Sequence, residues 1–94
     1  MRVGWLRTAL RNLDDETSYI AKDDEKAARR VVERILRAVA QLTQQSAIGR
    51  PGRMPGTREH IVTNTRYIAP YRIRGEEVQI LRVFHTSRKP PQRW

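Results

Sequence analysis

The sequence predicts an α+β domain in which an N-terminal strand and two antiparallel helices precede a three-stranded antiparallel sheet. Apolar residues recur every three or four positions up to residue 42, which is typical of amphipathic helices. After residue 57 apolar and polar residues alternate instead, and two short turn sequences divide this stretch into strands. A chain of 94 residues holds one core, so we expect a single domain over residues 1–94 with a short basic tail at 86–94.

The first half predicts a short strand followed by a helical hairpin. Val3–Leu6 is long enough for one strand, and the break at Ala21–Asp24 separates the two helices. The first helix turns its acidic residues 14–16 away from its apolar stripe. The two stripes consist of Leu10, Leu13, Thr17 and Ile20, and of Ala28, Val31, Ile35, Val39 and Leu42. We expect both stripes to be core.

Residues 44–56 change in character, because Gly, Pro, Gln and Ser dominate them and exclude regular structure. The predicted loop carries Arg50 and Arg53. Backbone N–H groups of such a loop bind phosphate in some proteins, but the spacing of a P-loop is absent. Phosphate binding here is therefore a hypothesis of low specificity.

The predicted sheet has hairpin turns at Asn64-Thr65 and Gly75-Glu76, and its last strand is expected over Val78–His85. A two-residue loop at the second turn sets the register, so that the facing pairs are Tyr71 with Ile80, Arg72 with Gln79 and Ile73 with Val78.

This register gives the middle strand two unlike faces. Arg72 and Arg74 point away from the helices, whereas the face toward the helices consists of Tyr67, Ala69, Tyr71 and Ile73. Pro70 has no backbone N–H, which predicts a bulge or an unpaired position in the middle of the strand and leaves a register shifted by one residue as the alternative.

The formal net charge of +9 is concentrated in the second half of the chain. Residues 46–94 carry ten Lys or Arg against three Asp or Glu, compared with nine against seven in residues 1–45. The second half is therefore the expected contact surface for an acidic partner, the alternative being a merely solvated basic surface. Cysteine is absent and no apolar run is long enough to span a bilayer, so we expect a cytoplasmic protein.

Catalytic motifs are scarce. Two histidines and no cysteine do not make a metal site, and we expect no cofactor. One set of side chains on the predicted strands is chemically suggestive, because cations around a histidine suit phosphodiester binding and general acid–base cleavage: Arg72, Arg74, Arg82, His85 and Arg88. The alternative is a histidine at the sheet edge among solvated arginines. Trp94 is either a packed anchor or an exposed stacking residue.

The order of elements resembles the RelE/ParE superfamily of bacterial type II toxin–antitoxin toxins. Six segments carry the resemblance in the same order over nearly the whole chain, namely Trp5 with Ala9, Tyr19–Ala21, Gly49–Gly52, Gly56–Glu59, Tyr67–Ile73 and Ile80–Arg88. The resemblance implies a growth-inhibiting toxin that a cognate ParD-like antitoxin holds inactive. ParE-like members poison DNA gyrase on its bound DNA, whereas RelE-like members cut mRNA on the ribosome.

Three departures from the RelE-like pattern favour the ParE-like branch. Ile68 stands where RelE-like nucleases usually carry an arginine, and no tyrosine follows Tyr71. Lys89 is the only lysine after Lys26, so the mRNA-binding lysines of some members are unmatched. The resemblance therefore implies inhibition by binding, with ribosome-dependent mRNA cleavage by Arg82, His85 and Arg88 as the alternative.

The same resemblance suggests two contact surfaces. We expect the gyrase–DNA complex to contact the basic residues Arg72, Arg74, Arg82, Arg88 and Lys89. We expect the antitoxin to contact the helical hairpin at Leu10, Leu13, Tyr19 and Val32, each of which is otherwise ordinary core. A basic module that binds nucleic acid without any toxin role is a third reading, although the chain lacks the interleaved aromatic residues of a stacking platform.

Overall fold

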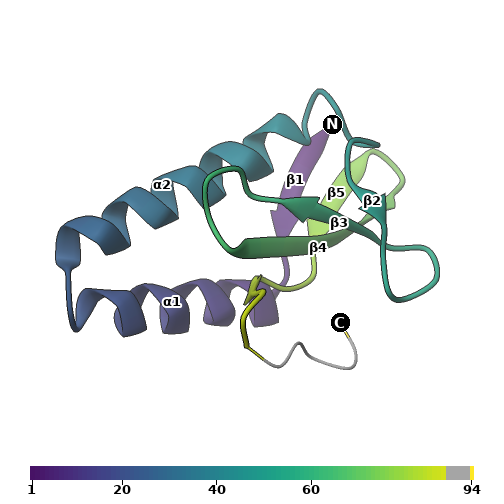
Figure 1. Cartoon of the computed structure of the whole chain (residues 1–94). Coiled ribbons are helices and arrows are strands. Elements are labelled where there is room, and N and C mark those ends of the chain that lie inside the picture. Colours follow the sequence, from purple (N-terminus) through teal and green to yellow (C-terminus); the bar gives the residue numbers. More distant parts are fainter. Residues whose placement is uncertain (89–93) are drawn as a thin grey trace.

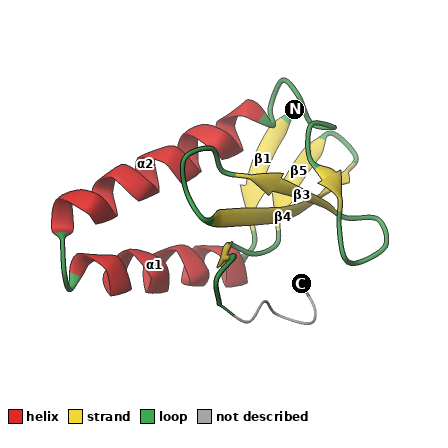
Figure 2. Ribbon diagram, in the orientation of Figure 1, coloured by secondary structure: helices red, strands yellow, loops and turns green. Residues whose placement is uncertain are grey.

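The computed structural model describes residues 1–88 and Trp94, and it contains two helices and a mixed sheet (Figures 1 and 2). The elements in chain order are β1 (Arg2–Trp5), α1 (Arg7–Ala21), α2 (Glu25–Gln41), β2 (Arg50–Pro51), β3 (Arg58–Ile61), β4 (Tyr67–Arg74), β5 (Glu77–Ile80) and β6 (Phe84–His85). The α+β class and the strand, hairpin and sheet order predicted from the sequence are confirmed.

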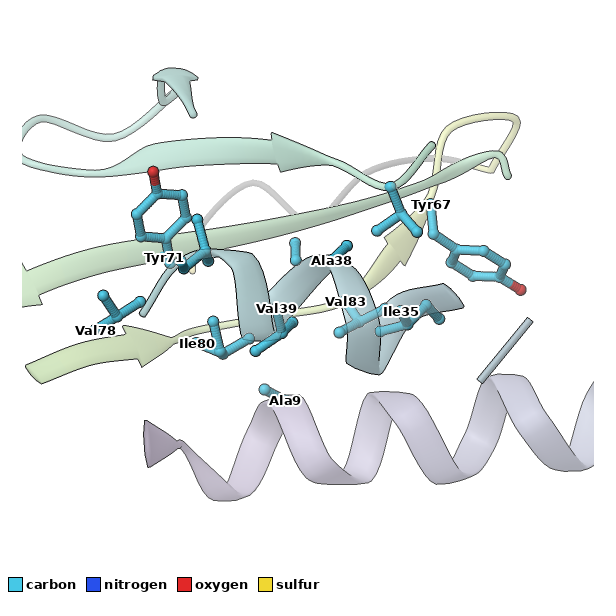
Figure 3. Packing of buried hydrophobic residues seen from close by; sticks show 12 residues of the cluster. Ala9, Ile35, Ala38, Val39, Tyr67, Tyr71, Val78, Ile80 and Val83 are labelled. Carbon is cyan, nitrogen blue, oxygen red and sulfur yellow. The ribbon is translucent and has the colours of Figure 1, made fainter. Parts of the chain in front are cut away.

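The helical hairpin is closed by a short turn and a polar cap. The Asp24 carboxylate accepts a hydrogen bond of 3.0 Å from the backbone N–H of Ala27, which satisfies one of the exposed donors at the start of α2. Ala9 of α1 is fully buried, and its small side chain lets α1 approach the core closely (Figure 3). Within the described residues, neither helix is long and apolar enough to cross a membrane.

The register of the β4–β5 hairpin is the one predicted from its turn. Tyr71 pairs with Ile80, Arg72 with Gln79 and Ile73 with Val78. Gly75 has a φ of 62°, a left-handed conformation that glycine adopts without steric cost. A two-residue loop therefore fixes which side chains of both strands face the helices.

The face of β4 toward the helices forms the core with β5 and both helices (Figure 3). Tyr67, Ala69 and Tyr71 are buried there, as predicted, together with Val78 and Ile80. Ile73 was predicted to join them, but it is 39% exposed because it lies next to the turn, beyond the cover of the helices.

The sheet is wider than the three antiparallel strands predicted. Its order is β1-β5-β4-β3-β2, and β1 pairs with β5 in parallel. A parallel partner cannot be recognised from a turn, because both helices and strands β2 to β4 lie between β1 and β5 in the chain. The predicted loop also contains β2, since Arg50 and Pro51 pair with Glu59 and Arg58.

The predicted strand Val78–His85 is divided into β5 and β6 by a bulge. His85 lies five positions after Ile80, whereas their partners on β4, Tyr67 and Tyr71, are four positions apart. Pro70 lies opposite the interruption, accepts a hydrogen bond from the Leu81 N–H at 2.9 Å and has no N–H to return. The sequence predicted a bulge or an unpaired position at Pro70, and the structure has the bulge.

The loop before β3 is attached to the core through the Tyr71 hydroxyl. This group accepts a hydrogen bond from the Gly49 N–H at 2.9 Å and donates one to the Ser46 carbonyl at 2.7 Å. The Tyr71 side chain is fully buried, so both loop groups depend on it.

Replacing Tyr71 with phenylalanine should lower the free energy of unfolding by about 1–3 kcal/mol, because a buried donor and a buried acceptor lose their partner. Urea denaturation measures this loss. The matched control is Tyr19→Phe, which removes the same atom from a 58% exposed ring and should leave stability unchanged. Equal midpoints for the two variants would contradict the assigned role of the hydroxyl.

Candidate functional site

A hollow of about 250 Å³ lies between α1 and the C-terminal segment. It is lined by Asn12, Glu16, Arg82, Val83, Phe84, His85 and Arg88. The bulge between β5 and β6 places Arg82 here, and the short β6 carries His85 beside it. Three of the five side chains that the sequence analysis grouped together are therefore neighbours.

Glu16 is the anionic centre of this hollow. Its carboxylate accepts a hydrogen bond from the Tyr67 hydroxyl at 2.9 Å and forms an ion pair with Arg88. The Arg88 guanidinium also lies 4.4 Å from the centre of the Tyr19 ring, a cation–π contact. Helix α1 thus holds Arg88 by charge and by an aromatic face.

The environment of His85 favours its neutral form. Burial lowers the pKa of His85, and the positive charge of Arg88 lowers it further, while Glu16 acts in the opposite direction. Its Nδ1 accepts a hydrogen bond from the Ser87 N–H at 3.1 Å. In the neutral ring the proton is therefore on Nε2, which leaves neither nitrogen free to accept another proton unless the Ser87 bond breaks.

The phenol ring of Tyr67 makes an edge contact with the His85 ring, with centroids 5.1 Å apart. Burial raises the pKa of Tyr67, and the hydrogen bond to Glu16 raises it further. The phenol is therefore a donor to Glu16 at neutral pH and not a base.

The bulge leaves one unusual polar atom beside the hollow. The Nε of Arg82 is buried and has no hydrogen-bond partner among the described residues. The neighbouring Val83 N–H is satisfied by the Asn12 side chain at 3.1 Å. An anion held by Arg82 would remove the cost of the unpaired donor.

Arg72 and Arg74 do not reach this hollow, so the predicted five-residue cluster is wrong in part. Arg72 lies five residues along β4 from Tyr67, roughly 17 Å at the usual rise of a strand. It donates to the Gln79 side chain at 2.7 Å, and Arg74 is exposed next to the turn. The predicted target-binding arginines therefore form two separate areas.

Trp94 is a packed side chain. Its ring stacks on Phe84 with centroids 5.6 Å apart, and its Nε1–H donates to the Thr57 hydroxyl at 3.2 Å. The Arg53 guanidinium lies 5.5 Å from the centre of the indole. Of the two readings of Trp94, the packed anchor is confirmed, while the predicted contact residue Lys89 lies outside the described residues.

The loop proposed for phosphate binding is occupied by a carboxylate. Glu59 is only 7% exposed, pairs with Arg50 at 3.1 Å and accepts a hydrogen bond from the Arg53 N–H at 3.0 Å. A backbone donor and a guanidinium that a phosphate would use are therefore already engaged by Glu59.

The four predicted antitoxin contacts have different surroundings. Leu10 and Tyr19 are exposed by 48% and 58%. Leu13 packs against the core, and Val32 is half-buried. Leu6, one helical turn before Leu10, is exposed as well and adds to the apolar surface of α1.

The sequence analysis missed Glu16 and Asn12 as members of the hollow. Residues 14–16 were expected to point outward together, which is wrong for Glu16, because it is half-buried against Tyr67. A run of acidic residues gives no signal for the one that lies beside the sheet. The signal that does exist is its spacing of three from Leu13 and Tyr19, which places it at the margin of the apolar stripe.

A protein family and a curated relative both match nearly the whole chain. The family described as the ParE toxin of the type II toxin–antitoxin system parDE matches residues 3–90. The toxin-like protein Y4kP of Sinorhizobium fredii is 48% identical over 91 residues, which cover 97% of this chain and 94% of that protein.

Two solved structures share the fold. A chain of the chromosomal ParDE toxin–antitoxin system from P. aeruginosa has a TM-score of 0.80 and 31% identity, with 90% of this chain and 95% of that chain covered. A chain of a RelBE toxin–antitoxin complex from Mycobacterium tuberculosis has a TM-score of 0.57 and 29% identity, with 89% and 88% covered. The protein described here therefore belongs to the ParE toxin family of type II toxin–antitoxin systems, within the RelE/ParE superfamily.

Proposed function

We propose that this ParE-type toxin acts in the cytoplasm by binding DNA gyrase on its bound DNA and stabilising the cleaved complex, and that a cognate ParD-like antitoxin neutralises it. The observation that carries the proposal is the match of the ParE family over residues 3–90. The P. aeruginosa structure belongs to a ParDE system, which supports an antitoxin partner.

The chemistry of the hollow supports binding over catalysis. A general base needs a free acceptor, but the Nδ1 of neutral His85 already accepts the Ser87 N–H. The nearby Tyr67 hydroxyl donates to Glu16, and its pKa is raised. A ribonuclease site at this place would require both interactions to change.

The basic surface carries cations that suit the acidic groups of a complex of gyrase and DNA. Arg74 is exposed and Arg72 is half-buried on the sheet face opposite the helices, while Arg82 and Arg88 line the hollow. Guanidinium groups bind phosphates and carboxylates with paired hydrogen bonds, and they carry most of the positive charge of this chain.

Tyr19 and Arg88 suggest how neutralisation and target binding are linked. Tyr19 is a proposed antitoxin contact, and its ring lies against the guanidinium of Arg88, a proposed target contact. An antitoxin segment on α1 at Tyr19 would therefore also cover Arg88. The two partners compete for one surface, so neutralisation needs no distant conformational change.

The decisive experiment incubates the purified chain with DNA gyrase, ATP and plasmid and scores gyrase-linked linear DNA after protease treatment. Linear DNA should increase with the concentration of free toxin and disappear when the antitoxin is added. Absence of cleavage by a folded, growth-inhibiting sample would contradict gyrase poisoning.

Neutralising the arginines of β4 tests the contact surface. The double variant Arg72→Gln/Arg74→Gln should weaken gyrase poisoning by about tenfold or more, because charged hydrogen bonds to the target are lost. Arg29→Gln/Arg30→Gln is the matched control, since it removes the same charge from the exposed face of α2. Circular dichroism verifies folding. Equal loss in both variants would indicate a general effect of charge.

Ribosome-dependent mRNA cleavage is the alternative function, and one observation favours it. Arg82, His85 and Arg88 do lie around one hollow, and the Arg82 Nε there is unpartnered among the described residues. The test is translation of a defined mRNA on ribosomes with mapping of the cut ends. Under the gyrase proposal, His85→Gln retains growth inhibition and no cuts appear. Cuts that vanish in His85→Gln would reverse the choice.

The apolar surface of α1 tests the antitoxin contact. Leu10→Asp should weaken the antitoxin complex by about tenfold or more, because an apolar side chain buried in the complex becomes a charge. Ile73→Asp is the control, since this isoleucine is exposed on the sheet, away from the hairpin. Isothermal titration calorimetry measures both. A larger loss for Ile73→Asp would place the antitoxin elsewhere.

A further inference from the structure

The edge of the sheet at β3 is only partly covered. Strand β2 pairs with Arg58 and Glu59 and with no residue further along β3. The Val62 N–H donates to the Tyr67 carbonyl at 3.0 Å, so the alternate residue Ile61 directs its backbone N–H and C=O away from β4. The end of β3 is therefore an open strand edge within the described residues.

Two connected hollows follow this open edge. One, of about 220 Å³, lies beside α2 and is lined by Arg34, Arg37, Ala38, Gln41, Thr63 and Asn64. The other, of about 340 Å³, includes Gln41 and Thr63 again and extends to Ile48, Arg50 and Ile61. Because they share two residues, the hollows form one groove along the edge.

The groove combines exposed apolar side chains with cations. Ile48 and Ile61 are 48% and 52% exposed, although native open edges are usually protected by charged residues or proline. Arg34 and Arg37 project from α2 on the other side of the groove, where Arg34 donates to the Asn64 carbonyl at 3.1 Å. Among the described residues that line the groove, Glu59 is the one carboxylate, and it is paired with Arg50.

We propose that an extended, acidic segment of the antitoxin binds in this groove and adds a strand to the open edge of β3. The proposal rests on the antitoxin partnership proposed above and names a second contact, apart from the apolar surface of α1. Backbone hydrogen bonds to Ile61 supply affinity, and the alternate side chains of the segment supply specificity.

The two sides of the groove define the sequence that fits. Side chains of the added strand alternate between the face of Ile61 and the face covered by α2. Those on the first side meet Ile61, and those on the second side meet Arg34 and Arg37. The segment therefore alternates apolar residues with Asp or Glu.

Other occupants fit the groove less well. A second copy of this chain would bring its own Arg34 and Arg37 to the same edge, in a protein whose net charge is already +9. A nucleic acid would satisfy the guanidinium groups, but it would leave the exposed isoleucines and the strand edge without partners. An acidic peptide satisfies all three.

The experiment measures amide hydrogen exchange and affinity with the full chain and its co-expressed antitoxin. The Ile61 amide should exchange at least about tenfold more slowly in the complex than in the free toxin, because its outward N–H becomes hydrogen-bonded. Ile61→Pro removes that N–H without touching the β3–β4 ladder, and it should weaken the complex by about tenfold. Ile61→Val keeps the N–H and a branched side chain, and it should bind like the native chain.

A second variant covers the case in which Ile61→Pro does not fold. Arg34→Glu/Arg37→Glu should weaken the complex more than Arg29→Glu/Arg30→Glu, which reverses the same number of charges on exposed α2 residues. A tight complex in which Ile61 stays unprotected and both groove variants bind normally would overturn the groove and leave antitoxin binding intact.

Two further outcomes would also decide the matter. Failure to form any complex would overturn the antitoxin partnership itself. Protection of Ile61 by a single-stranded oligonucleotide, or by self-association of the toxin at high concentration, with none from the antitoxin, would assign the edge to a different partner.

Discussion

The two-sided pairing of β4 is the constraint on which the rest of the structure depends. This strand pairs with β3 on one edge and with β5 and β6 on the other. Tyr67, Ala69 and Tyr71 face the helices, whereas Arg72 lies on the opposite face, where Ile68 and Pro70 are buried as well. One strand thereby builds the core and presents cations, so a shift of its register by one residue would misplace both sets of side chains.

Pro70 in this strand is associated with the bulge that shapes the hollow. Pro70 has no N–H to donate to the strand beside it. The neighbouring segment is divided there into β5 and β6 by one extra residue. The interruption places Arg82 beside α1 and starts β6 one position later. Glu16 then holds Arg88 against Tyr19, so the C-terminal segment and the first helix form one surface.

Under the function proposed above, that surface would serve two partners. The basic groups proposed to contact gyrase and its DNA lie next to the apolar side chains of α1 proposed to contact the antitoxin, and Arg88 and Tyr19 are in contact with each other. The open edge of β3 and its groove are the second antitoxin contact that we propose. A segment that spans both proposed sites would bind more tightly than a segment at either site alone.

The sequence by itself determined the helical hairpin and the β4–β5 turn, and it reduced the position of Pro70 to a bulge or an unpaired N–H, because each depends on neighbours in the chain. Local periodicity, a two-residue loop and a missing N–H leave few alternatives. Only the tertiary structure decided the parallel pairing of β1 with β5, the inward position of Glu16 and the separation of Arg72 from His85. Those features join residues far apart in the chain, and alternation alone gives the face of a strand but not the position along it at which another element packs.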